Sequence, residues 1–533
     1  MNRFERLLTA GAIIACMSVV PGVASADPGE DHGRDDIPVP TPSLQKADPG
    51  IENMELLDVS KKDGTTNSDI AFYGNMAYVG NYDGFRIIDI SDPSNLEVRS
   101  DLTCRANQGD LSVFRGKNGR RYLLQSIDRP VTAPDCTATD TPLVAEDERG
   151  VSRNRARFGY EGLRLFDVTD PESPQYVRFY RTACGSHTHT LVPDPAHNRV
   201  NAYVASYPLG AGITPEVDQE ESDRRNLTCE APHRKISVVS LPLSDPEAGR
   251  VRTRALSEDT EYYDPDGPYS PTGGGQNGTQ PQGTAEPIQA CHDHQVFMPR
   301  KIVVGSCAGD AQYWSIAASA GDPTSGDGEA HTHIKRENGT TESFDFIHNA
   351  TVTWDGKYTT ISDESGGGGA PRCDAQQTKR GFTFFYPLVE PGAQVDGFAD
   401  LKGTYMIPRP QNTEICVSHN GNILPVKDRY LQVQAFYQGG NSFYDFTNLT
   451  APQELAWSDL ETRAGSADSW STYWYNGVVY VNGGLNRRNS GPGASDGNRG
   501  FEAYALDDLD GTSQPTKRWS HFNPQTQEAS QAP

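Results

Sequence analysis

Histidines stand at four related places in this chain, each at the start of a short segment with the pattern of a β-strand. At two of these places the sequence reads His-x-His, and residues two apart on a strand point to the same face. The histidines concerned are His187, His189, His292, His294, His348 and His419. Neutral imidazole is a ligand for copper, zinc, iron and nickel, so several such rings gathered at one point would form a transition-metal site.

Two chemical interpretations of these histidines remain open. Gathered around one point, they would bind a transition-metal ion, copper or zinc, and support a metal-dependent oxidoreductase. Used singly, each ring would hydrogen-bond a carbonyl group of a neighbouring strand and tie the fold together without an ion. Asp69, Asp110 and Asp293 stand beside the aligned positions, where we expect them to act as acceptors that orient the rings.

A glycine-rich segment, Asp363–Gly369, is a second candidate site. Glycines let the backbone approach a ligand closely, and Glu364 would serve as a ligand or a base; the alternative is a tight structural turn. The segment lacks the Lys and the helix of a phosphate-binding loop. His331 and His333 form another His-x-His, but we place them near the outer strand of their blade and do not include them in the candidate metal site. No Gly-x-Ser-x-Gly nucleophile elbow or paired-carboxylate motif stands out, so the sequence gives hydrolase chemistry no positive support.

An internal repeat indicates which elements must position the histidines. The segments YDGFRIIDISDP (82–93) and YEGLRLFDVTDP (160–171) share Tyr, Gly, Arg, two Asp and Pro. Each alternates with a period of two and ends in an Asp-Pro turn, which is typical of a strand. Strand-like segments flank both copies, and four short antiparallel strands in sequence make one propeller blade.

Five more degenerate copies of the same strand follow this template. They are 235–239, 311–315, 381–385, 441–445 and 500–504. The sequence therefore predicts an all-β fold, a seven-bladed β-propeller of four-stranded antiparallel blades over residues 51–515. A blade cannot bury both faces alone, so the ring must close, and Met54–Asp58 would supply the outer strand of the last blade. The innermost strands of a propeller line its axis, where the histidines would meet.

These residues resemble the LVIVD-repeat family. The likeness lies in AYVGNYDGFRIIDISDP, CRANQGDLSVF, ACHDHQVF and DESGGGGAPRC and extends over nearly the whole chain after residue 50. It implies an exported bacterial or archaeal propeller, and the family has no shared activity to carry over. The ring of histidines is also similar to the copper centres of nitrous-oxide reductase and of the selenium-binding methanethiol oxidases, in architecture and residue type alone.

The two ends of the chain differ from the repeats in composition. Residues 1–26 have the pattern of a signal peptide, with Arg3, Arg6, an apolar run and a cleavage site after Ala26; acylation of Cys16 is the alternative. Residues 27–50 are predicted to be a disordered leader and 516–533 a polar tail. No later run approaches the ~20 apolar residues of a membrane-spanning helix.

The cysteines and the net charge limit the classes of function that fit this chain. Eight cysteines follow the signal peptide, and we expect them to pair in sequence order as Cys104–Cys136, Cys184–Cys229, Cys291–Cys307 and Cys373–Cys416. The net charge of −24 argues against nucleic acid as a partner. We expect a secreted monomer that acts as a binding scaffold for an extracellular ligand, surface protein or polymer, with the metal-dependent oxidoreductase as the alternative.

Overall fold

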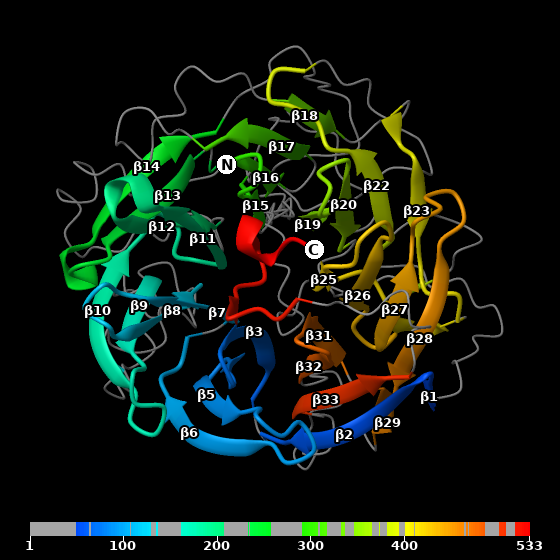
Figure 1. Cartoon of the computed structure of the whole chain (residues 1–533), viewed down its shortest axis with the longest axis horizontal. Coiled ribbons are helices and arrows are strands. Elements are labelled where there is room, and N and C mark those ends of the chain that lie inside the picture. Colours follow the sequence, from blue (N-terminus) through cyan, green and yellow to red (C-terminus); the bar gives the residue numbers. More distant parts are fainter. Residues whose placement is uncertain are drawn as a thin grey trace, which may run out of the picture.

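The computed structural model is a ring of β-sheets whose innermost strands surround a central axis (Figure 1). We call the region along this axis, enclosed by the innermost strands, the channel. It describes residues 50–62, 65–106, 108–128, 135–136, 161–206, 233, 235–256, 290–307, 310–316, 332–335, 346–364, 372–373, 381–393, 400–409, 411–462, 465–466, 468–484, 500–507 and 517–533. The predicted signal peptide, nearly all of the predicted leader and residues 365–369 of the glycine-rich segment lie outside this part of the chain.

Seven blades of four antiparallel strands form the ring, as the sequence predicts. From the channel outward, blade 1 contains β3 (Asn67–Tyr73), β4 (Met76–Asn81), β5 (Gly84–Asp89) and β6 (Glu97–Thr103), and blade 2 contains β7 (Gln108–Arg115), β8 (Arg121–Ile127), β9 (Gly162–Asp167) and β10 (Gln175–Arg181). Blade 3 contains β11 (Thr188–Asp194), β12 (Arg199–Ala205), β13 (Lys235–Pro242) and β14 (Arg250–Ala255). Blade 4 contains β15 (Asp293–Phe297), β16 (Ile302–Cys307), β17 (Asp310–Ser315) and β18 (Thr332–Lys335). Blade 5 contains β19 (Ile347–Val352), β20 (Tyr358–Asp363), β22 (Thr383–Pro387) and β23 (Gly403–Tyr405), and blade 6 contains β25 (Gly421–Ile423), β26 (Leu431–Ala435), β27 (Asn441–Asp445) and β28 (Gln453–Asp459). Blade 7 contains β31 (Asp468–Tyr475), β32 (Val478–Gly484), β33 (Gly500–Leu506) and β2 (Met54–Ser60).

The ring closes with a strand from the beginning of the described chain, which confirms the prediction for Met54–Asp58. β2 pairs antiparallel with β33, so Met54 lies opposite Leu506, and blade 7 gains its outermost strand. Just before it, β1 (Gly50–Glu52) adds a fifth strand to blade 6 by pairing with β28. The first and last blades are therefore joined by backbone hydrogen bonds.

The arginine shared by the two repeats makes the same contact in both blades. Arg86 on β5 donates to the backbone carbonyls of Ser60 (3.0 Å) and Lys61 (3.1 Å), at the end of β2. Arg164 on β9 donates to the carbonyl of Arg105 (2.9 Å), just after β6. Both guanidinium groups are buried. Each arginine thus joins the third strand of its blade to the end of the preceding blade's outer strand.

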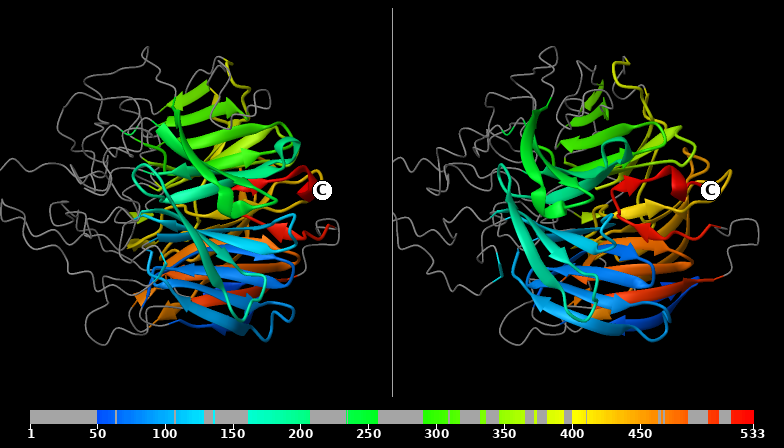
Figure 2. Two further views of the ribbon diagram at one scale, coloured as in Figure 1. Left: turned by 90° about the vertical axis from the view of Figure 1, so that its left-hand side faces the viewer. Right: turned by 60° about the vertical axis from the view of Figure 1, so that its left-hand side comes forward.

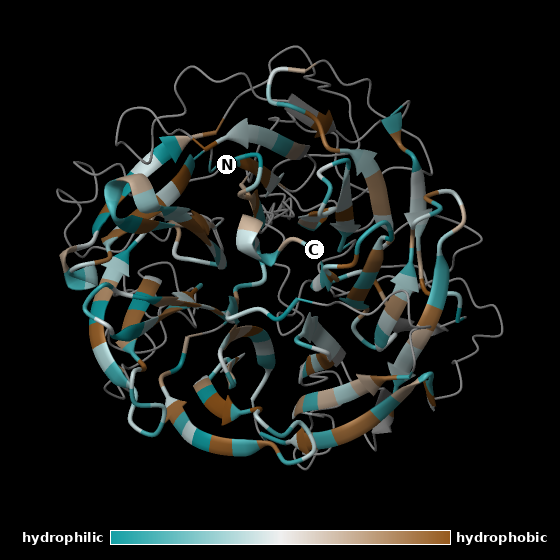
Figure 3. Cartoon of the chain, viewed as in Figure 1, coloured by the Kyte–Doolittle hydropathy of each residue, from teal (hydrophilic) through white to brown (hydrophobic). Residues whose placement is uncertain are grey.

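Apolar side chains fill the space between blades. The strands alternate hydrophobic and hydrophilic residues, as Figure 3 shows by colour. Between blades 1 and 2, for example, Phe85 and Phe166 from the third strands of the two blades meet edge to face with ring centroids 5.1 Å apart. This repeat of apolar contacts around the ring is what a period-two pattern in short strands predicts.

The C-terminal segment, residues 517–533, lies over the channel and not away from the propeller (Figures 1 and 2). Its composition predicts a polar tail, and the structure shows that this polar segment is packed in place. β34 (His521–Phe522) pairs with β3, β35 (Thr526–Gln527) runs parallel to β15, and η7 (Ala529–Gln531) follows. These contacts lie at the ends of the innermost strands.

Small elements and disulfides complete the described fold. They are the two-residue to five-residue strands β21 (Arg372–Cys373), β24 (Gln411–Ile415), β29 (Glu461–Thr462) and β30 (Gly465–Ser466), with η2 (Pro195–His197) and η3 (Pro246–Ala248). The predicted disulfides Cys104–Cys136 and Cys291–Cys307 are present. The other two predicted pairs each include a cysteine whose side chain is outside the described part. Within that part, no helix is long and apolar enough to cross a membrane.

Candidate metal centre

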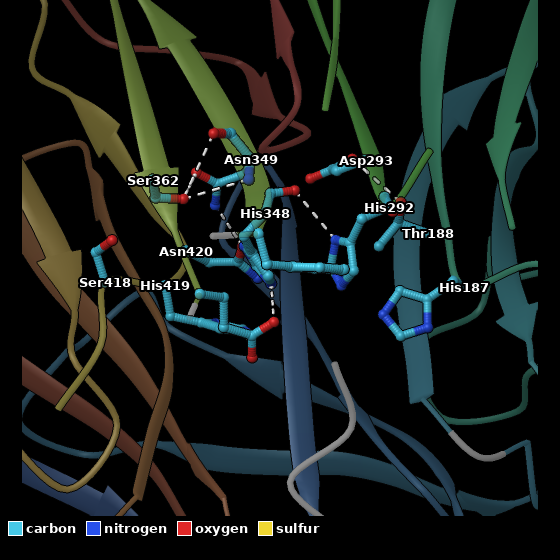
Figure 4. A network of polar contacts seen from close by, with 12 residues as sticks. His187, Thr188, His292, Asp293, His348, Asn349, Ser362, Ser418, His419 and Asn420 are labelled. Atoms are coloured by element: carbon cyan, nitrogen blue, oxygen red, sulfur yellow. Dashed lines mark hydrogen bonds and ion pairs between the residues drawn. The ribbon is translucent and has the colours of Figure 1, made fainter. Parts of the chain in front are cut away.

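One side chain from each blade meets around the channel axis, at the level where the innermost strands begin. In order around the ring these are Tyr82, Gln108, His187, His292, His348, His419 and Trp470. The centroids of neighbouring imidazoles from His187 to His419 are 4.2, 4.1 and 4.0 Å apart (Figure 4). None of the seven side chains is more than 5% exposed. The structure therefore brings four of the six predicted histidines together.

Backbone pairing places these histidines at one level. Three of them stand just before the first strand of their blade, and each backbone N–H donates to a carbonyl near the end of the second strand. The pairs are His187 to Ala205 (2.9 Å), His292 to Ser306 (2.7 Å) and His419 to Ala435 (2.9 Å). His348 lies within β19, where the register shifts between Ile347 and Ala350. Equivalent positions in four consecutive blades thus form an arc around the channel.

Hydrogen-bond acceptors fix which nitrogen carries the proton in three of the rings. Nδ1 of His292 lies 3.1 Å from the backbone carbonyl of His348, and Nδ1 of His419 lies 2.5 Å from a carbonyl of blade 7. Nδ1 of His187 lies 3.2 Å from the carboxylate of Asp128. A carbonyl oxygen only accepts, so Nδ1 of His292 and His419 is a donor and Nε2 of each ring keeps its lone pair. Nε2 of His187 accepts from the amide nitrogen of Gln108 (2.8 Å), so Nδ1 carries the proton in this ring as well.

A carboxylate stands beside the imidazoles. Glu364 follows β20 directly, and its two oxygens lie 3.8 Å from Nε2 of His348 and 3.7 Å from Nε2 of His419. Ligand atoms of His292, His348 and Glu364 all lie within 4.8 Å of one another. The ligands of a tetrahedral zinc ion, each ~2.0 to 2.1 Å from the metal, lie roughly 3.3 Å apart, so these side chains would move closer together to hold an ion. The hydroxyl of Tyr437 donates to Glu364.

Burial keeps the imidazoles of His292, His348 and His419 neutral. It lowers the pKa of His419 to about 3. It also lowers the pKa values of His292 and His348 well below the ordinary value, and the neighbouring imidazoles lower them further. Neutral imidazole is the form that binds a metal ion.

His189 and His294 take part in other contacts. Nδ1 of His189 lies 3.0 Å from the carboxylate of Asp110 and 2.8 Å from the hydroxyl of Ser126, both in blade 2. The ring of His294 packs edge to face on Trp314, with centroids 5.6 Å apart. The rings of His189 and His294 thus lie outside the cluster. The carbonyl contacts expected in the structural interpretation are made by His292 and His419, each with the next blade.

The three predicted acceptors do not orient the four clustered rings. Asp110 contacts His189, as described above. Asp69 accepts hydrogen bonds from Ser471 (2.7 Å) and Tyr473 (2.7 Å). Asp293 accepts from the backbone N–H of His294 (2.7 Å). Burial, and then the neighbouring Asp110 carboxylate, raise the pKa of Asp69.

The residues that sequence reasoning missed share one position. Asp128 directly follows β8, the second strand of its blade, and Tyr437 follows β26 by two residues, as Glu364 follows β20. In an antiparallel pair, the end of the second strand lies beside the start of the first. The signal was therefore available: polar residues after each second strand face the same mouth as the histidines.

Comparison with known proteins identifies the repeat. Residues 64–101 match the LVIVD repeat model. This LVIVD repeat covers β3, β4 and β5 and most of β6. None of the curated proteins matches the sequence. The Cps50 (Swd1) β-propeller domain of Myceliophteria thermophila is similar over 80% of this chain and 96% of its own, with 9% identity and a TM-score of 0.41. Chaetomium thermophilum Raptor is similar over 86% of this chain and 30% of its own, with 10% identity and a TM-score of 0.39.

Proposed function

We propose that this propeller holds a transition-metal ion at the clustered histidines and acts as a metal-dependent oxidoreductase. One observation carries the proposal: imidazoles from four consecutive blades meet beside Glu364, and acceptors fix Nδ1–H on three of them. Histidines bound to a metal usually donate their other ring N–H to a carbonyl or carboxylate. Imidazole nitrogens with a carboxylate suit copper, zinc or iron.

The residues of the site have separate tasks in this proposal. His292, His348 and Glu364 would hold the ion, and Asp128 would orient the ring of His187. Copper is the ion we expect to bind most tightly, because affinity among divalent first-row metals peaks at copper. Bound copper would supply one-electron redox chemistry. The burial of the ring keeps bulk water away from the ion.

Metal binding by the full chain tests the proposal. After treatment with a chelator, the protein is titrated with copper(II) and, separately, zinc(II), and copper(II) is followed by electron paramagnetic resonance. Replacing His292→Ala and His348→Ala together should weaken copper binding by about 100-fold or more. His197→Ala is the matched control, because this imidazole is at the surface, with its side chain 37% exposed. Copper binding by the double variant at the affinity of the parent chain would overturn the proposal.

A binding scaffold is the second candidate function, and a groove on the outer rim supports it. The groove has a volume of about 530 Å³ and lies between β23 and β28. Tyr405, Met406 and Trp457 line it, and the guanidinium of Arg409 lies 4.4 Å from the centroid of the Trp457 ring. Such an aromatic wall suits the sugar rings of a surface polysaccharide. Titration with soluble polysaccharides, followed by tryptophan fluorescence, should give binding that Trp457→Ala abolishes; equal binding by this variant would exclude the groove.

Export as a monomer is part of the same proposal. The two disulfides support it, because disulfides persist in oxidising compartments. We propose cleavage after Ala26, so mass spectrometry of the mature protein should find Asp27 at its N-terminus. A lipid-modified Cys16 at that position would favour the lipoprotein alternative.

A further inference from the structure

The C-terminal segment occupies the far end of the channel from the histidines. Figure 1 shows it crossing the middle of the ring, and Figure 2 shows it at one face. Within the described chain it contacts the innermost strands of blades 1 to 5 at their ends. The contacts with strands are Phe522 to Phe72, Asn523 to Val113, Thr526 to Leu191, Thr526 to Val296 and Gln527 to Val352.

Amide side chains of this segment replace the partner strand that an innermost strand lacks. Asn523 accepts from the backbone N–H of Val113 (2.7 Å) and donates to its carbonyl (2.9 Å). Gln527 does the same with Val352, at 3.0 and 2.7 Å. An innermost strand leaves N–H and C=O groups on its open edge, and these groups need partners when they are buried. This explains why the segment is polar in composition and still fixed in place.

Two aromatic residues anchor the segment. Trp519 and Phe522 are 4% and 2% exposed. The Trp519 ring packs on Trp474 and Trp354, with centroids 5.2 and 5.9 Å away. A buried aromatic anchor followed by amide contacts indicates a segment that belongs to the folded core.

The segment also reaches toward the histidines. The amide of Gln525 donates to the carboxylate of Asp69 at 3.4 Å, and both side chains are buried. Asp69 lies near the start of β3, close to the level of the histidines. Val352, which holds Gln527, is four residues beyond His348, roughly 13 Å along the strand. The segment thus extends through the far part of the channel.

We infer that residues 517–533 are a plug that closes this end of the channel, so that an ion at the histidines exchanges with solvent through the opposite end alone. The statement about the ion rests on the proposed function. Closure of the channel does not depend on the proposed function, because all the contacts that support closure are between residues of the protein.

Chemical labelling of Asp69 in the metal-free protein tests the plug. The reagents are a water-soluble carbodiimide and glycine ethyl ester, with the label located by mass spectrometry. Asn523→Ala with Gln527→Ala removes five hydrogen bonds, including one from the Gln295 amide to Gln527 (2.9 Å), and keeps the Trp519 and Phe522 anchors. Asn95→Ala with Gln175→Ala is the matched control, because both of these amides are exposed. Labelling of Asp69 should be about tenfold faster in the plug variant and unchanged in the control.

Copper release provides the second measurement. Transfer of bound copper(II) to a small chelator should also be about tenfold faster in the plug variant. Equal labelling of Asp69 in the parent chain and the plug variant would overturn the plug, whatever the copper result. Faster labelling without copper binding would keep the plug and exclude the metal centre. If the double variant does not fold, Thr526→Val removes only the bond to the Leu191 carbonyl (2.6 Å) and is tested in the same way.

Discussion

Replacement of Arg86 by Met tests whether the repeat arginine holds adjacent blades together. Arg86→Met keeps an unbranched apolar side chain and removes the guanidinium. In the structure this group donates to the Ser60 hydroxyl at 3.1 Å and to the carbonyls of Ser60 and Lys61 at 3.0 and 3.1 Å. These acceptors end β2, the strand that closes the ring. The substitution therefore acts on the junction between blades 7 and 1.

The expected cost follows from these contacts. Each lost hydrogen bond contributes about 1 kcal/mol, and more where its acceptor stays buried. The side chain of Arg86 is 2% exposed, but Ser60 and Lys61 are only partly covered, so water replaces part of the loss. We expect Arg86→Met to lower the free energy of unfolding by about 3 kcal/mol. Arg164→Met should cost at least as much, because its acceptor at Cys104 is buried.

Denaturation by guanidinium chloride, followed by tryptophan fluorescence, measures this cost. Arg99→Met is the control, because its ion pair with Asp89 is at the surface and should contribute less than about 1 kcal/mol. Hydrogen exchange should also show β2 opening first in Arg86→Met. If Arg86→Met and Arg99→Met have the same stability, the arginine does not hold the blades together and the reasoning fails.

Three further predictions concern burial and the candidate site. Burial lowers the pKa of His233 to about 3, whereas the unfolded chain takes up this proton near pH 6.5; its contribution to stability is present above pH 6.5 and is lost as the pH falls toward 3, by up to about 1.4 kcal/mol per pH unit. His233→Asn should reduce the slope of unfolding free energy against pH between 6 and 4 by about that amount in urea titrations, and an unchanged slope would contradict the assignment. Trp519→Ala should cost about 3 to 5 kcal/mol in the same assay, since it empties a buried aromatic site; a cost under about 1 kcal/mol would mean that the C-terminal segment is not anchored. Tyr437→Phe should weaken copper binding about 10-fold to 100-fold, because the Tyr437 hydroxyl donates to the ligand Glu364; competition with a chelator measures the affinity, and an unchanged affinity would remove Tyr437 from the site.

The blades could be predicted because the residues that specify each strand and turn are close together in the sequence. Each third strand carries a period-two pattern and a turn, so the seven copies could be counted, although β22 begins two residues later than the predicted Gly381. The closing strand was predictable for a different reason: Met54–Asp58 has a strand pattern and no neighbour to pair with. His333 lies on the outermost strand of blade 4, where the sequence places it.

The parts that escaped prediction depend on contacts between distant segments. Asn523 and Gln527 have the composition of a disordered tail, and only the unpaired edges of the innermost strands give these amides a folded role. In both His-x-His pairs the first ring, His187 or His292, joins the cluster and the second does not, and only the contacts of the folded blades show this difference. Asp128 was missed because its signal is its place after the second strand of blade 2, and only the paired strands bring that place beside the histidines.

The pairing of β2 with β33 has a consequence for how the chain assembles. The two strands are at opposite ends of the propeller sequence, so blade 7 stays incomplete, with an open sheet edge, until nearly the entire chain is available. Long-range pairing of this kind makes folding slow and leaves that edge exposed meanwhile. A β2 strand from a second chain fits the same edge, because it is identical. Refolding at high protein concentration should therefore yield dimers that exchange β2, each containing two complete rings.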